Sequence, residues 1–138
     1  MLRPVKWAAI LGLGLLAGAG CSLGGDDEPP PARGAPKEVA RAVQALDLAT
    51  RRRDYATICN DLFTPAAKRR AGGRGCARLL AESGREVRRP RIQLLEIELN
   101  RRGARARVRT RAEGQRPIED TLVLRRVGRE YRIEALAG

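Results

Sequence analysis

Apolar residues first follow a helical period along this chain. From Pro36 to Arg51 they recur at steps of three and four, the spacing that brings side chains onto one helix face: Val39, Ala42, Val43, Leu46 and Ala49. Proline suits the first turn of such a helix, because the N–H group that it lacks would be unpaired there. The pattern therefore predicts an amphipathic helix over 36–51.

Three shorter helical stretches are expected next. Asp54 is a suitable N-cap for a helix whose apolar positions are Tyr55, Ile58, Cys59, Leu62 and Phe63. Thr64-Pro65 has the form of another N-cap with proline at the first helical position, and opens a short turn to Arg70. After a glycine-rich loop over 72–75, a helix is expected over 76–81, with Cys76, Leu79 and Leu80 on one side and Ser83-Gly84 at its end.

The second half of the chain alternates between apolar and polar residues, which is typical of strands. The alternation of Ile92–Leu99 slips by one residue between Leu94 and Leu95, and this predicts a β-bulge. A turn over 100–103 leads to a second strand, a loop over 113–117 to a third with Leu122 and Leu124, and a tight turn at Gly128 to a fourth with Tyr131, Ile133 and Leu136.

This order of elements predicts the fold class. Helices followed by a run of antiparallel strands indicate an α+β domain, in which the helices pack on one face of a sheet of about four strands. The domain would span residues 36–138, a size that suits one small domain.

The N-terminus resembles an export signal. Arg3 and Lys6 precede an apolar run that extends from Trp7 to Gly20, which is shorter than the roughly 20 apolar residues of a membrane-spanning helix. Small residues at 17–20 precede Cys21, an ending that resembles a bacterial lipobox, although Gly18 stands where that pattern usually has leucine. We therefore expect a signal peptide over 1–20 and lipidation of Cys21; the alternative is an ordinary secretory signal cut near Ala19 or Gly20.

The residues that follow Cys21 suit a tether. Residues 21–35 are rich in glycine, proline and acidic side chains and have too little apolar content to fold. With lipid on Cys21, the protein would be held on the extracytoplasmic face of the cell membrane.

The remaining cysteines, Cys59 and Cys76, form an even pair in an exported protein. A structural disulfide is expected between them, because export leads to an oxidising environment. No metal site and no cofactor are expected: the sequence has no histidine, and two cysteines alone do not complete a tetrahedral site.

The formal net charge of +12 has two interpretations. A basic protein can bind nucleic acid or an anionic surface, but nearly all of the 28 basic residues are arginine, and with abundant alanine and glycine this is also typical of GC-rich coding. Nucleic acid is not expected as a partner, because aromatic residues make up only 3% of the chain and base-stacking platforms need them.

A row of arginines marks the second strand. Arg105, Arg107, Arg109 and Arg111 alternate with small or apolar residues and would lie on one sheet face. They would form either a cationic stripe for anionic lipids or wall polymers, or merely a solvated face. With a hairpin loop over 100–103, Glu98 would face Arg105 and Glu96 would face Arg107, which favours the solvated face.

At this level the chain resembles a known family. A long first helix, the segments R-R-D-Y-A-x-x-C and C-A in the next helices, and a final V-G-R-E-Y-R-I-E-A-L are similar to small exported lipoproteins with a nuclear-transport-factor-two-like cone fold. The resemblance implies a cone-shaped α+β domain over roughly 36–136, and family members often carry a helix-to-helix cysteine pair. It leaves function open, because this fold hosts isomerases, dehydratases, binding modules and scaffolds.

The candidate catalytic residues are few. The absence of histidine excludes histidine-based acid–base chemistry. Asp47, Asp54, Tyr55, Asp61 and Tyr131 remain, and capping or surface roles are expected for the carboxylates. We therefore expect a non-enzymatic, lipid-anchored protein that binds a small hydrophobic ligand or an envelope protein; the alternatives are a cationic adaptor for anionic polymers or lipids, and an isomerase- or dehydratase-like enzyme.

Overall fold

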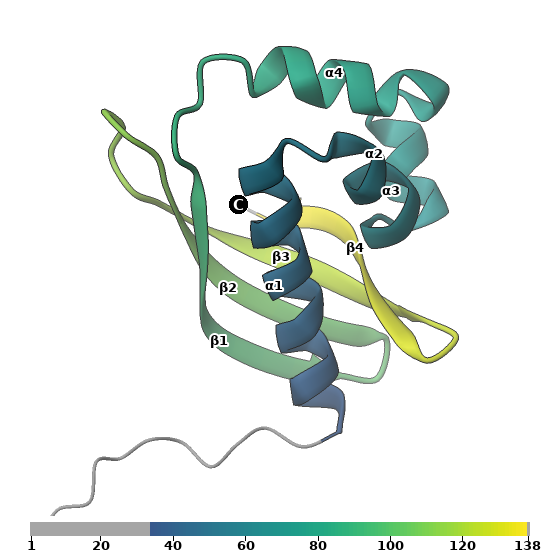
Figure 1. Ribbon diagram of the computed structural model, residues 1–138. Helices are drawn as coiled ribbons and strands as arrows, with labels where there is room; N and C mark the ends of the chain where they lie inside the picture. The colour runs from purple at the N-terminus through teal and green to yellow at the C-terminus, as the bar shows by residue number, and fades with distance from the viewer. Residues whose placement is uncertain (1–33, 138) are drawn as a thin grey trace, which may run out of the picture.

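A computed structural model describes residues 34–137 of the chain (Figure 1). The predicted signal peptide, Cys21 and the tether as far as residue 33 lie outside the described residues. The helical part comprises α1 (Ala35–Arg52), α2 (Tyr55–Thr57), a π-helical turn η1 (Ile58–Leu62), α3 (Pro65–Arg70), a 3₁₀ turn η2 (Gly73–Gly75) and α4 (Cys76–Ser83). The strands β1 (Arg91–Asn100), β2 (Gly103–Arg111), β3 (Ile118–Val127) and β4 (Glu130–Ala137) form one antiparallel sheet in sequence order. The predicted α+β class is confirmed.

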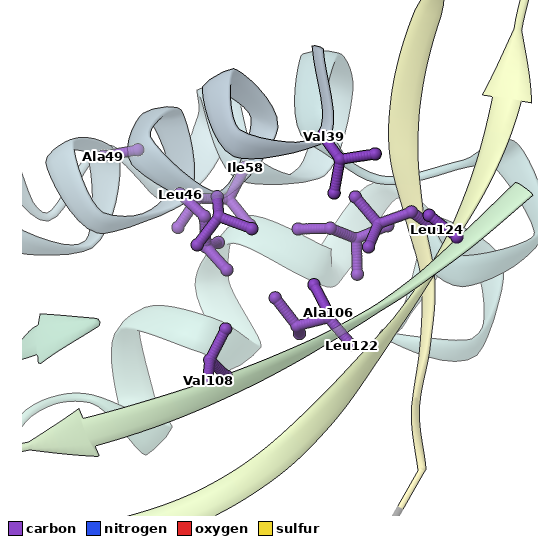
Figure 2. Packing of buried hydrophobic residues seen from close by; sticks show 11 residues of the cluster. Val39, Leu46, Ala49, Ile58, Ala106, Val108, Leu122 and Leu124 are labelled. Atoms are coloured by element: carbon purple, nitrogen blue, oxygen red, sulfur yellow. The ribbon is translucent and has the colours of Figure 1, made fainter. Parts of the chain in front are cut away.

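Helix α1 crosses one face of the curved, open sheet, and the shorter helices gather beyond its C-terminal end (Figure 1). Val39, Val43, Leu46 and Ala49 are its buried residues, as the helical period predicted. Ala104 and Ala106 of β2 are fully buried, and their small side chains let the helix lie close to the sheet. Figure 2 shows the α1 side chains facing those of the strands, among them Ala106, Val108, Leu122 and Leu124.

The second helix begins as predicted but does not remain α-helical. The carboxylate of Asp54 accepts a hydrogen bond from the Thr57 amide at 3.1 Å, which confirms the cap. At Ile58 the winding loosens, and the amide of Phe63 bonds to the carbonyl of Ile58, five residues back, at 2.9 Å. Phe63 itself is extended and bridges Ile133 of β4, so the prediction of a helix through Phe63 was wrong by its last residue.

The next two helices agree with the sequence in outline. Thr64 caps α3 by accepting from the Ala67 amide at 3.1 Å, and α4 ends beside Gly84. Cys76 is buried and Leu80 packs against the core, but Leu79 is 41% exposed, so its predicted place on their side of the helix was wrong. A disulfide joins Cys59 of η1 to Cys76 of α4, as expected.

The register of the first hairpin is the predicted one. Asn100 pairs with Gly103, Glu98 with Arg105 and Glu96 with Arg107, and the register shifts between Leu94 and Glu96, which confirms a bulge at Leu95. Gly103 is required at the turn, because a Cβ there would collide with the backbone of Leu124 on the neighbouring strand.

A second register shift lies between β3 and β4. Val123 pairs with Ala135 while Leu124 pairs with Ile133, so Glu134 is an extra residue in β4. Bulges bend the strand that carries them. The two outer strands of the sheet therefore both carry a bend, and the one in β4 sets the position of Glu134.

Candidate functional site

An apolar cleft of about 510 Å³ lies between the helices and the sheet. It is formed by the C-terminal half of α1, by α2 to α4, and by the strand ends that lie away from the 100–103 turn. Its apolar lining comprises Leu46, Tyr55, Ile58, Phe63, Ala67, Ala71, Leu80, Ile92, Val108, Leu122, Ile133, Ala135 and Leu136. Its polar lining comprises Thr50, Arg70, Thr110, Asp120 and Glu134.

The local structure of the helical layer explains which side chains reach the cleft. The π-helical turn carries Ile58 into the lining, and Phe63 follows where the chain becomes extended against β4. Single π-helical turns of this kind often occur at functional sites. The disulfide ties this turn to α4, which contributes Leu80, so a covalent bond joins two segments of the cleft wall.

One polar cluster lies at the edge of the cleft, around Glu134. Its carboxylate accepts a hydrogen bond from the hydroxyl of Thr64 at 2.6 Å and lies 3.5 Å from the guanidinium of Arg70. Arg70 also donates to the main-chain carbonyl of Glu134. The Thr64 hydroxyl serves twice, since it also accepts the capping bond of α3. The bulge in β4 is thereby joined to α3.

The charge of Glu134 follows from these contacts. The hydrogen bond from Thr64 lowers the pKa of this carboxyl below its usual range; the guanidinium groups of Arg70 and Arg125 lower it further, against a smaller opposing effect of burial. Glu134 is therefore a carboxylate at neutral pH, with its oxygens already engaged. It is a poor general acid in this state.

The candidate catalytic residues do not converge. Asp47 accepts from the Ile92 amide at 2.7 Å and pairs with Arg51 at 3.0 Å, so it joins α1 to β1. Asp54 caps a helix, and its hydrogen bonds with Thr57 lower its pKa. Tyr55 lines the apolar cleft, whereas Asp61 and Tyr131 line a separate depression between α1 and the 128–129 turn.

Sequence reasoning missed the polar residues of the cleft, which are Arg70, Asp120 and Glu134. One signal was available for Glu134: Ile133 and Leu136 both fit the inward set but are three residues apart, which a strand accommodates only with a bulge. Arg70 and Asp120 carried no such signal, because exposed helix and strand ends commonly hold charged residues.

The arginine row lies on the sheet face that points away from α1, and its neutralisation is partial. Arg107 lies between Glu96 at 3.1 Å and Glu119 at 3.4 Å, and Glu119 also accepts from Nε of Arg109 at 3.0 Å. Glu119 was not predicted as a partner; its hydrogen bond from Arg109 lowers its pKa. Within residues 34–137 neither Arg105 nor Arg111 forms an ion pair, although Glu98 stands opposite Arg105 as predicted.

Two further properties concern the whole described region. Over residues 34–137, the structure contains no cluster of three or more side chains suited to hold a metal ion. None of the helices in this range is long and apolar enough to cross a bilayer.

Comparison of the chain with protein-family models, with curated proteins and with solved structures gave no significant match.

Proposed function

We propose that this chain is a lipid-anchored, extracytoplasmic protein that binds a small, mainly apolar molecule in the cleft and does not transform it. The cleft of about 510 Å³ carries this proposal. Its volume falls in the ~300–1,000 Å³ range of small-molecule sites, and its composition, largely apolar with a few polar groups, is the usual one for such sites. In the resemblance to the cone-shaped lipoproteins, this cleft corresponds to the interior of the cone.

The polar groups suggest how such a ligand would lie. Apolar side chains from α1, η1 and the sheet would surround its body, while Arg70, Asp120 and the threonine hydroxyls would meet a polar end near the rim. Leu136 is 67% exposed although it lines the cleft, and a ligand seated there would cover it. Burial of exposed apolar surface is the main source of affinity in such a site.

An isomerase- or dehydratase-like activity has less support. Such chemistry needs a base held within reach of the substrate by an oriented partner. Glu134 is engaged by Thr64 and Arg70, and Tyr55 and Asp61 belong to different depressions. Binding therefore remains the proposed activity.

Binding can be tested with N-phenyl-1-naphthylamine, a neutral probe that fluoresces in apolar surroundings. We expect the purified full protein to bind it, and Ala71→Trp to weaken binding at least tenfold, because an indole at this lining position would occupy the cleft. Ala66→Trp on α3 is the matched control, since Ala66 does not line the cleft. Equal binding by both variants, with unchanged unfolding curves, would refute the proposed site.

A further inference from the structure

A second depression, of about 400 Å³, lies at the opposite end of the sheet from the apolar cleft. It is lined by Asn100, Val123 and Leu124 and by four arginines: Arg101, Arg102, Arg105 and Arg125. We call these four residues the turn-end arginine cluster. It draws on the 100–103 turn and on two adjacent strands, so the fold rather than the sequence brings its members together.

The turn that carries the cluster has a defined geometry. The side-chain oxygen of Asn100 accepts from the amides of Arg102 at 2.8 Å and of Gly103 at 3.0 Å. Gly103 lies too close to the backbone of Leu124 to admit a Cβ, so the turn packs directly on β3. The arginines therefore extend from a fixed backbone, and binding would order only their side chains.

The charge of the cluster is largely uncompensated. The structure of residues 34–137 gives no ion pair to Arg101, Arg102 or Arg105, and Arg125 has only a long one, 3.9 Å from Glu134. That carboxylate is already held by Thr64 and Arg70. Glu98 stands opposite Arg105 in the register without an ion pair. Guanidinium groups arranged in this way suit phosphate oxygens, to which they donate bidentate hydrogen bonds.

The cluster lies at the end of the molecule where the chain enters the domain. The N-terminal end of α1 and both hairpin turns lie at this end (Figure 1). Glu38 and Arg41 of α1 share a depression with Arg129 and Glu130 of the 128–129 turn, and Val39 lies beside Leu124 (Figure 2). Leu99 and Val127, at the same end, are 46% and 39% exposed.

The length of chain before α1 limits how far this end can lie from Cys21. Thirteen residues separate Cys21 from the first described residue, Gly34, counted to include it. Such a segment reaches at most ~45 Å when fully extended and averages ~20 Å as a flexible coil. An anchor at Cys21 would thus keep this end of the domain near the bilayer surface.

We propose that the turn-end arginine cluster docks the protein on the membrane by binding the phosphate groups of anionic lipids. The inference rests on the proposed lipid anchor, which would place the cluster within reach of the head groups. Exposed Leu99 and Val127 beside the cluster favour a lipid surface over free phosphate, because a bilayer offers both anionic and apolar contacts. Each arginine near such a surface contributes about fivefold to the partition coefficient at low salt.

The test uses the lipidated protein in vesicles of phosphatidylcholine, with or without phosphatidylglycerol, and measures the rate at which phenylglyoxal modifies each arginine. Phosphatidylglycerol should slow modification of Arg101 and Arg102 at least fivefold, while Arg85 and Arg88, beyond α4 at the other end, change less than twofold. Salt near 1 M should abolish the protection, because the Debye length falls to ~3 Å. Equal protection at both ends would refute the docking site.

Two further arms separate other outcomes. Inorganic phosphate without vesicles should protect weakly; protection as strong as that given by phosphatidylglycerol would overturn the membrane assignment. Arg101→Gln with Arg102→Gln should remove the protection of Arg105 and Arg125, and the charge-matched Arg85→Gln with Arg88→Gln should not. If Cys21 carries no lipid, the proposed anchor fails. The exported protein should then still float with anionic vesicles in a manner that depends on Arg101 and Arg102, and its failure to float would refute docking separately.

Discussion

At the scale of single residues, Glu134 shows how one side chain can join two layers of the fold. It is the extra residue of a bulged strand, and it holds Thr64 and Arg70 from the helical layer. Its side chain is 18% exposed, so these contacts are partly shielded from water. A hydrogen bond to a charged group contributes about 1.5–3 kcal/mol, more than a neutral one.

Replacing Glu134 should therefore reduce stability in a manner that depends on pH. Because the folded-state pKa is lowered, the stabilising contribution of this group is complete above its unfolded pKa of about 4.3 and is lost as the pH falls through the folded value. Glu134→Gln should lower the free energy of unfolding by about 1 kcal/mol at pH 7, and the difference from the parent should shrink below pH 4. Urea unfolding at pH 7, 5 and 3 measures both effects.

The control for Glu134→Gln is Glu98→Gln, because Glu98 is exposed and forms no ion pair with described residues. This variant should match the parent at every pH. A constant difference between Glu134→Gln and the parent from pH 7 to pH 3 would contradict the assigned ionisation.

Arg107 should contribute little to stability despite its two ion pairs. Its side chain is half exposed, and ion pairs at such sites contribute about 0–1 kcal/mol. Arg107→Gln should thus lower the free energy of unfolding by less than about 1 kcal/mol. Arg111→Gln, from the same row but without an ion pair in the described region, should have an even smaller effect. A loss above about 2 kcal/mol for Arg107→Gln would mean that the row stabilises the sheet.

At the scale of elements, the disulfide compensates for the shortness of the helices beyond α1. Helices α2, α3 and α4 span three, six and eight residues, lengths at which isolated helices are unstable. The bond between Cys59 and Cys76 closes a loop with a sequence separation of 17 and joins η1 to α4. Both sulfurs are buried, so the bond also belongs to the packed interior.

Removal of the disulfide should weaken both the fold and the cleft. Cys59→Ala with Cys76→Ala should lower the free energy of unfolding by about 3 kcal/mol, the loop-entropy value for this length. Binding of the naphthylamine probe should weaken too, because Ile58 and Leu80, on either side of the bond, line the cleft. Thermal unfolding and probe titration, with the reduced parent as reference, measure these effects. An unchanged melting temperature would contradict the structural role.

At the scale of the whole molecule, the two candidate sites occupy opposite ends of one sheet. The apolar cleft lies beyond the C-terminal half of α1, and the turn-end arginine cluster lies near its N-terminal end. A protein docked through the cluster would present the cleft away from the bilayer. This arrangement would let a ligand enter from the aqueous side while the domain stays on the membrane.

The anchor itself gives the last prediction. Small residues before Cys21 and the tether after it predict lipidation, so Cys21→Ala should leave the protein unprocessed or release it from membranes. Fractionation and mass spectrometry of the parent and the variant would decide this. Cys59→Ala with Cys76→Ala is the control for loss of cysteine, and it should keep the parent's fractionation. Identical fractionation and mass shift of Cys21→Ala and parent would contradict the anchor.

The sequence by itself determined the elements and most of their local detail. Period and capping located α1 and the starts of α2 and α3, because N-caps and amphipathic faces depend on residues close in sequence. The slip at Leu95 and the turn at 100–103 likewise predicted the register of the first hairpin. Two cysteines in an exported chain were enough to predict their bond.

Only the tertiary structure decided where the layers separate and which distant side chains meet. A hydrophobic period shows which face is buried but not how wide the gap above it is, so the cleft had no signature in the sequence. Thr64 and Glu134 are 70 residues apart, and their contact depends on the second bulge and on the way the chain after η1 joins β4. The four arginines of the turn-end cluster likewise come together only because a turn and two strands meet there. Both candidate sites are therefore products of long-range packing, which local patterns do not encode.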